Sequence, residues 1–190
     1  YDSFVLYGNQ SISTYTRSNV AIWMTMALQA GMLNIGAFLS CRQFVSHVTG
    51  FATLFGLEVQ RADYFHAAGF LLVPVLFLAG AMVSGVLVDL RLRLKKDPKY
   101  YLVFGVMFLL TLFVAIAGFN GAFGEFGQST RVSRDFTLLA FLSLICGLQN
   151  GTITSVSKSV VRTTHLTGIT TDLGIGIVRV LNKRRITTDY

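Results

Sequence analysis

Residues 101–124 read YLVFGVMFLLTLFVAIAGFNGAFG, a continuous run without a charged side chain. A helix needs about 20 apolar residues to cross the hydrocarbon core of a bilayer, and this run is long enough. Three more uncharged runs of comparable length occupy residues 20–41, 67–88 and 136–157. We therefore predict an all-α, polytopic membrane protein with four full spans.

The composition of the whole chain agrees with lipid as its solvent. Hydrophobic residues make up 53% of the chain and charged residues 13%, against about a quarter charged in soluble domains. The net charge of +7 lies in short basic clusters between apolar runs, without interleaved aromatic residues. This pattern favours membrane topology over nucleic-acid binding. The expected partner is the lipid bilayer, and no nucleic acid is expected.

Two further apolar runs, residues 44–57 and 165–178, are shorter than the four predicted spans. At a rise of about 1.5 Å per residue each covers roughly 21 Å as a helix, which is short for a straight crossing. Both carry a Thr-Gly pair near their start, where a chain break can precede a helix. We predict two short, Thr-Gly-led helices that are re-entrant or broken.

Charge counting favours the re-entrant arrangement. The loop of residues 91–99 carries five basic residues and one acidic residue, so it is expected in the cytoplasm. With both short helices re-entrant, the tail of Lys183, Arg184 and Arg185 is cytoplasmic as well. With two full crossings that tail would lie outside, against the rule. A kinked full crossing stays open as an alternative.

An internal repeat is the most specific feature of the sequence. LQAG at residues 28–31 and FVSHVTG at 44–50 recur as LQNG at 148–151 and VRTTHLTG at 161–168. In the re-entrant topology the second copy is inverted. Inverted repeats that carry short helices are typical of transporters with a site near the bilayer midplane. We predict copies at residues 20–62 and 136–181 within one transmembrane domain, residues 20–185, between a polar segment, 1–19, and a tail, 186–190.

The Thr-Gly pairs are candidate substrate-binding residues. Thr49, Gly50, Thr167 and Gly168 would place unpaired backbone N–H groups and hydroxyls at helix starts, and a purely structural role is equally compatible. His47 and His165 hold matching positions in the two copies. A proton relay is conceivable there, and a structural hydrogen bond is the preferred interpretation. No metal ligand set accompanies either histidine.

The second short segment contains the best single candidate, Asp172, next to Thr171. An ionisable side chain at membrane depth is a functional hypothesis by default, although Asp172 could instead be solvated or paired with Arg162 or Arg179. Arg162 itself has the planar fork that binds an anionic group. Lipid phosphate is the alternative ligand for Arg162.

Other polar and small residues within the spans predict packing. The amides Gln29, Asn34, Gln149 and Asn150 are expected to join helices by hydrogen bonds, with a cavity-lining role second. Small residues four apart let helix backbones approach closely. They occur as the pairs Ala27/Gly31, Gly80/Ser84, Ala81/Gly85 and Gly147/Gly151.

The chain resembles the YoaK-type family of bacterial inner-membrane proteins, a family without an established function. The resemblance covers residues 20 to about 185 and is carried by Ala30-Gly31, FVSHVTG at 44–50, GLQN at 147–150 and RTTHLTG at 162–168. Asn34 and Phe51 depart from the Asp and Asn usual in the family. The resemblance implies a multi-pass protein of the bacterial inner membrane with one more span after residue 190, and it implies no substrate.

These observations lead to one functional hypothesis and one alternative. The inverted repeat predicts a small transporter or channel-like protein for a small polar or anionic solute. The alternative is a non-transporting accessory or structural subunit of a larger membrane complex. As assemblies, the sequence leaves open a homo-oligomer or such a larger complex. No hydrolase, metalloprotease, nucleotide-binding or dinucleotide-binding motif occurs. The protein is therefore expected not to be an enzyme and to bind no cofactor.

Overall fold

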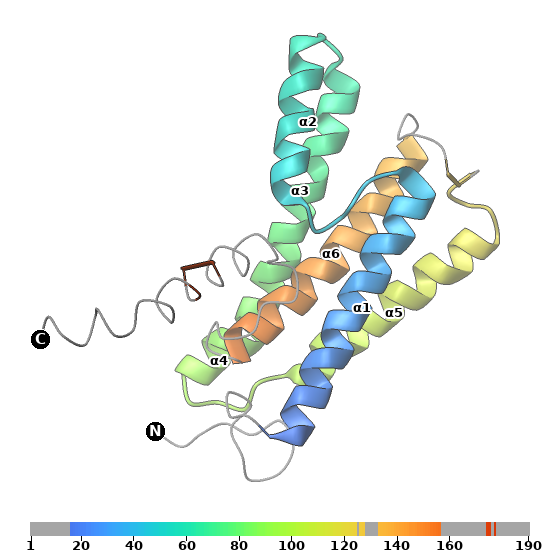
Figure 1. The fold of residues 1–190 in the computed structure, drawn as a ribbon. Helices are drawn as coiled ribbons and strands as arrows, with labels where there is room; N and C mark the ends of the chain where they lie inside the picture. Colours follow the sequence, from blue (N-terminus) through green and yellow to red (C-terminus); the bar gives the residue numbers. More distant parts are fainter. Residues whose placement is uncertain (1–15, 125, 128–132, 157–173, 176, 178–190) are drawn as a thin grey trace, which may run out of the picture.

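The computed structural model describes residues 16–124, 126–127, 133–156, 174–175 and 177, and the regular structure within them is entirely helical. Figure 1 shows the helices in chain order. Their bounds are α1 Arg17–Cys41, α2 Val48–Gln60, α3 Tyr64–Ser84, the π turn η1 Gly85–Asp89, α4 Leu90–Arg93, α5 Tyr100–Phe119 and α6 Ser133–Val156.

The prediction of four helices of membrane-spanning length and composition is confirmed. Helices long and apolar enough to cross a membrane occupy Val20–Cys41, Tyr64–Arg93, Tyr100–Phe119 and Arg134–Ser155. Large apolar side chains such as Met24, Phe108 and Met82 are more than 60% exposed along these helices. Such exposure is costly in water and free of cost in lipid. The fold is that of a multi-pass helical membrane protein.

Helix α6 occupies the centre of the bundle, between α1, α3 and α5 (Figure 1). Of the residues in its most apolar stretch 72% are buried, against 22% or less of the residues in the corresponding stretches of the other three spans. α6 also supplies much of the two buried clusters, including Leu139, Leu142, Ile145 and Leu148. Polar side chains on α6 are therefore the ones that lie deepest in the protein.

Two span boundaries differ clearly from those expected, each by five residues. The second span continues beyond residue 88 to Arg93, because the π turn at Gly85–Asp89 prolongs the helix instead of ending it. The third span ends at Phe119, five residues before the end of the uncharged run. Gly121 and Gly124 there have positive φ values of 73° and 77°, which only glycine adopts readily.

The crossing of α3 and α6 depends on glycine. A Cβ at Gly147 would overlap the carbonyl oxygen of Phe77, and one at Gly80 would overlap the carbonyl oxygen of Leu144. The predicted packing role of Gly80/Ser84 and Gly147/Gly151 is thus confirmed. It does not hold for Gly31 or Gly85, where a Cβ would meet nothing within 4 Å.

Helix α2 is the first of the two predicted short segments. α1 ends and α3 begins at the same end of the bundle, and α2 lies alongside the first half of α3 (Figure 1). The connection 42–47 turns back toward the bundle before α2 begins. Val45 from this connection and Phe51 from α2 are buried against Phe70 and Val73 of α3.

We expect Gly147→Ala to destabilise the protein by about 1 to 3 kcal/mol, because the added methyl group overpacks a backbone contact. Gly105→Ala in α5 is the matched control, since a Cβ there meets nothing within 4 Å. The control should be neutral or slightly stabilising, as alanine favours a helix more than glycine does. Thermal unfolding in detergent measures both. Equal unfolding temperatures for the two variants would contradict the close crossing.

Candidate functional site

The structure describes three of the nine predicted site residues. His47, Thr49 and Gly50 lie together at the start of α2. The other six lie outside the described residues, and their roles stay predictions: Arg162, His165, Thr167, Gly168, Thr171 and Asp172. The second short segment lies mostly there as well, so the inverted repeat also stays a prediction, and so does the placement of Lys183, Arg184 and Arg185.

The start of α2 differs in detail from the expected Thr-Gly cap. The helix begins at Val48, with His47 as the residue before it, and no side chain caps its N–H groups. Thr49 is exposed and contributes its backbone oxygen to the Thr53 hydroxyl, at 3.1 Å. The His47 ring lies against Gly50, where a Cβ would be 2.6 Å from Nδ1. Gly50 therefore makes room for His47, and Thr49 takes no part in capping.

Asn34 fixes the connection that leads into α2. Its Nδ2 donates to the Ser46 hydroxyl at 2.7 Å, and its Oδ1 accepts the Ser46 backbone N–H at 3.0 Å. The predicted role as a hydrogen-bonding amide is confirmed, although its partner lies in the 42–47 connection and not on another helix. One amide thus satisfies two polar groups of a segment that has no helical partners of its own.

The carboxyl-terminal half of α6 carries a dense group of polar side chains within a membrane span. Residues 149–155 read QNGTITS. Thr152 pairs with Ser84 of α3 at 2.8 Å, and the Gln149 amide nitrogen donates to the Met26 carbonyl of α1 at 2.5 Å. Gln149 therefore joins two spans, as predicted. The amide nitrogen of Gln149 is thus hydrogen-bonded, and only its amide oxygen lacks a partner.

Three buried oxygens of this stretch have no hydrogen-bond partner within the part of the chain that the structure describes: Gln149 Oε1, Asn150 Oδ1 and Thr154 Oγ1. Buried polar atoms are paired in nearly all proteins, and unpaired ones call for an explanation. In lipid the requirement is stricter, because no bulk water reaches them. The sequence marked Gln149 and Asn150 as amides, whereas Thr154 had no distinguishing signal.

The unpaired atoms fall on two faces of α6. Asn150 and Thr154 are four residues apart and therefore neighbours on the helix surface. They share the flank of Gly147 and Gly151, which meet Phe77 and Ala81 of α3. Gln149 instead turns toward α1. All three atoms are oxygens that can accept a hydrogen bond from a ligand, and the Thr154 hydroxyl can also donate one.

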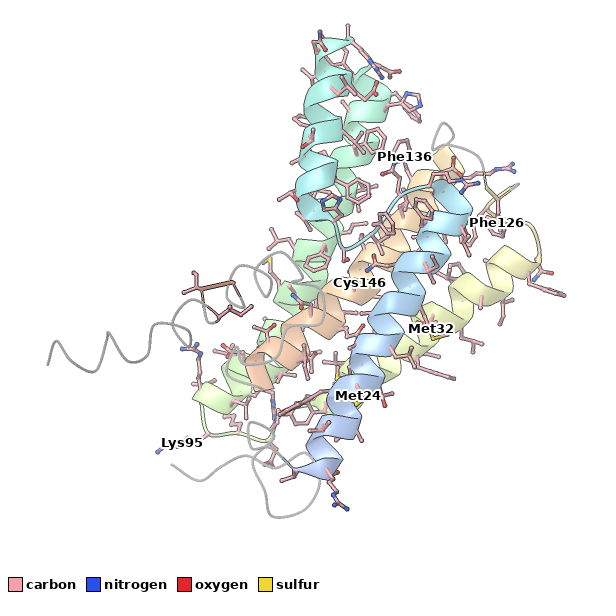
Figure 2. All side chains as sticks on the ribbon, in the orientation of Figure 1. Met24, Met32, Lys95, Phe126, Phe136 and Cys146 are labelled. Atoms are coloured by element: carbon pink, nitrogen blue, oxygen red, sulfur yellow. The ribbon has the colours of Figure 1, made fainter. Side chains whose placement is uncertain are left out.

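Other chemistry is sparse among the described residues. They contain no group of three His, Cys, Asp or Glu side chains able to hold a metal ion. Cys41 and Cys146 are both buried and not bonded to each other. Figure 2 shows Cys146 on the central part of α6. Phe51, at a position where the resemblance implied asparagine, is only 1% exposed and packs against Phe70.

Asp63 is the charged residue whose titration the fold alters most clearly outside the spans. The backbone N–H of His66 donates to Asp63 Oδ1 at 3.2 Å, and the His66 ring approaches Oδ2 at 2.7 Å. These bonds lower the pKa of Asp63 below its ordinary value of 3.8. The carboxylate caps α3 at the turn that follows α2.

Four apolar spans, charges confined to the ends and polar groups concentrated on the central helix define a multi-pass helical membrane protein. The family described as Protein of unknown function (DUF1275) matches residues 22–189, and the chain belongs to this family. The narrower YoaK-type name stays a resemblance. No curated protein and no solved structure matches the chain.

We expect Asn34→Ala to accelerate hydrogen exchange at the Ser46 amide and to lower stability by about 1 to 3 kcal/mol, because it leaves Ser46 groups unpaired. Asn34→Asp is the matched control. Its carboxylate still accepts from the Ser46 N–H, and the Ser46 hydroxyl can rotate to donate. Unchanged protection of Ser46 in the alanine variant would show that Asn34 does not hold this connection.

We expect acid to weaken the cap on α3. Because folding lowers the pKa of Asp63, its carboxylate stabilises the fold above the ordinary value, and this contribution disappears as the pH falls through the lowered pKa. Unfolding temperatures measured from about pH 5 down to pH 2 should fall less in Asp63→Asn, which keeps an acceptor without the charge. If the unfolding temperatures of both proteins fall equally in acid, groups other than Asp63 cause the pH dependence.

Proposed function

We propose that this protein is a small transporter or channel-like protein for a small polar solute. The observation that carries the proposal is the set of unpaired acceptors on α6, at Gln149, Asn150 and Thr154. Each would cost about 1 to 3 kcal/mol if nothing bound it. A solute or water that passes along this helix and donates hydrogen bonds would offset that cost.

The position of these acceptors supports a pathway more than a structural network. The other polar side chains of the stretch are satisfied locally: Thr152 donates to Leu148 O and Ser155 donates to Gly151 O, each at 2.8 Å. Some hydroxyls of this helix are hydrogen-bonded to its backbone, while neighbouring buried oxygens have no hydrogen-bond partner. Such oxygens are suited to bind a ligand transiently. The two amide oxygens only accept hydrogen bonds, so they favour neutral or cationic donors over anions, whereas the Thr154 hydroxyl can donate or accept.

The anionic part of the solute hypothesis has a separate basis. It rests on Arg162, Thr167 and Gly168, and on the expectation that the second short segment faces the first across the bilayer midplane. Asp172 would sit on the same segment and favour a cation or a proton. The proposal includes location in a bacterial inner membrane, with residues 91–99 in the cytoplasm, and no catalytic activity.

The test uses Thr154→Val, which replaces a hydroxyl by a methyl group of similar size. We expect the flux of urea, glycerol or ammonium into proteoliposomes to fall about tenfold, the effect of losing one hydrogen bond of about 1.4 kcal/mol. The unfolding temperature should stay equal or rise, because an unpaired buried oxygen is removed.

Thr152→Val is the matched control on the same helix. Its hydroxyl is paired with Ser84, so the change should lower stability by about 1 kcal/mol and affect flux only through folding. If Thr154→Val destabilises the protein and leaves every flux unchanged, Thr154 is structural. If the wild-type protein gives no flux of any of the three solutes above that of empty liposomes, the proposal is wrong as stated.

A further inference from the structure

The charges of the described residues are distributed unequally between the two ends of the bundle. The charged residues of this part of the chain lie in the connections or near the ends of the helices, and these connections and ends gather at the two ends of the bundle (Figure 1). The end that holds α4 has six basic and two acidic residues: Arg17, Arg91, Arg93, Lys95, Lys96 and Lys99, with Asp89 and Asp97. The opposite end has three of each: Arg42, Arg61 and Arg134, with Glu58, Asp63 and Asp135.

Backbone hydrogen bonds fold the basic residues into one turn. The N–H of Lys99 donates to the carbonyl of Leu87, inside the π turn, at 3.0 Å. The N–H of Lys95 donates to Leu92 O and that of Lys96 to Arg91 O, at 3.1 and 2.9 Å, which is the hydrogen-bond pattern of a Schellman cap. The segment 94–99 therefore returns onto the helix it leaves.

Lys95 occupies the left-handed position of this cap, with φ of 55°. Glycine is the usual residue there, and any other L residue except asparagine or aspartate is disfavoured. The position holds an exposed lysine instead (Figure 2). The cap thus presents an ammonium group at the very end of the bundle.

Four of the five cations in the turn have no ion pair among the described residues, the three lysines among them. Arg93 pairs with Asp89 at 2.7 Å, and Arg91 donates to the backbone oxygen of Asp97 at 2.6 Å. Lys95, Lys96 and Lys99 form no ion pair with any residue that the structure describes. Leu94 and Tyr101 beside them are 56% and 70% exposed. Ammonium groups next to exposed apolar and aromatic side chains match the boundary between headgroups and acyl chains.

We infer that the turn formed by residues 91–99, with Tyr101, is a binding surface for anionic phospholipid headgroups. The turn joins two membrane spans, Tyr64–Arg93 and Tyr100–Phe119. It is therefore expected at the level of the lipid headgroups, whose phosphate groups are the nearest anions. The ammonium groups would bind the headgroup phosphate, and Leu94 and Tyr101 would contact the glycerol and upper acyl carbons.

The test titrates the full chain, purified in neutral detergent, with phosphatidylglycerol and with phosphatidylcholine. Native mass spectrometry measures the bound lipid, and unfolding temperature measures stabilisation. We expect phosphatidylglycerol to bind more tightly and to raise the unfolding temperature more. Near a membrane surface each lysine contributes about a fivefold gain in affinity. Lys95→Asn/Lys96→Gln should therefore weaken phosphatidylglycerol binding roughly 25-fold.

Asparagine tolerates the left-handed conformation, so this variant removes charge while keeping the cap. Arg61→Gln/Arg134→Gln removes two charges from the opposite end and should change affinity less than about twofold, because those sites lie beyond the reach of screened charges. Lys95→Arg/Lys96→Arg should restore binding. Lys99→Gln gives an independent variant, since its backbone bond to Leu87 does not involve the side chain, and should cost about fivefold.

Three results would overturn the inference. The first is equal binding of phosphatidylcholine and phosphatidylglycerol by the wild-type protein. The second is an equal loss of affinity in the control from the opposite end. The third is the same stabilisation by inorganic phosphate at the concentration of the lipid, which would assign the surface to a free anion.

Discussion

The close contact between α3 and α6 is the constraint on which the rest of the structure depends. Gly147 meets the backbone of Phe77, and Gly80 meets the backbone of α6. In a membrane no hydrophobic effect drives helices together, so close van der Waals packing of small residues has to do so. This contact holds α6 at the centre. That position buries Gln149 and Thr152 and brings Ser84 within 2.8 Å of Thr152.

Much of the fold follows from the sequence alone, because the energetic penalty of charge in lipid is large and local. Four uncharged runs predicted four spans, each overlapping a helix in the structure. What the sequence did not predict depends on backbone geometry. The π turn at Gly85–Asp89 has no residue pattern that distinguishes it from α-helix. The early end of α5 coincides with glycines of positive φ, and a hydropathy pattern carries no information about φ.

The candidate site was less accessible to sequence reasoning. The repeat directed attention to Thr49 and Gly50, and the structure gives Thr49 no capping role and Gly50 a steric one under His47. Asn34, Gln149 and Asn150 were recognised as hydrogen-bonding amides. Which of their atoms would remain unpaired depends on partners far away in the chain, such as Met26, which lies 123 positions from Gln149. Thr154 carries no local signal, because a threonine in a span normally bonds to its own helix.

The π turn also has a rotational consequence. An α-helix advances about 100° per residue, and a π turn accommodates one residue more than an α turn in nearly the same arc. If residues 85–89 wound as ordinary α-helix, everything after them would be rotated by about 100° around the axis. Arg91 and Arg93 would then project from another side of the helix. The five residues of the π turn thus determine the side of the helix from which the basic residues after it project.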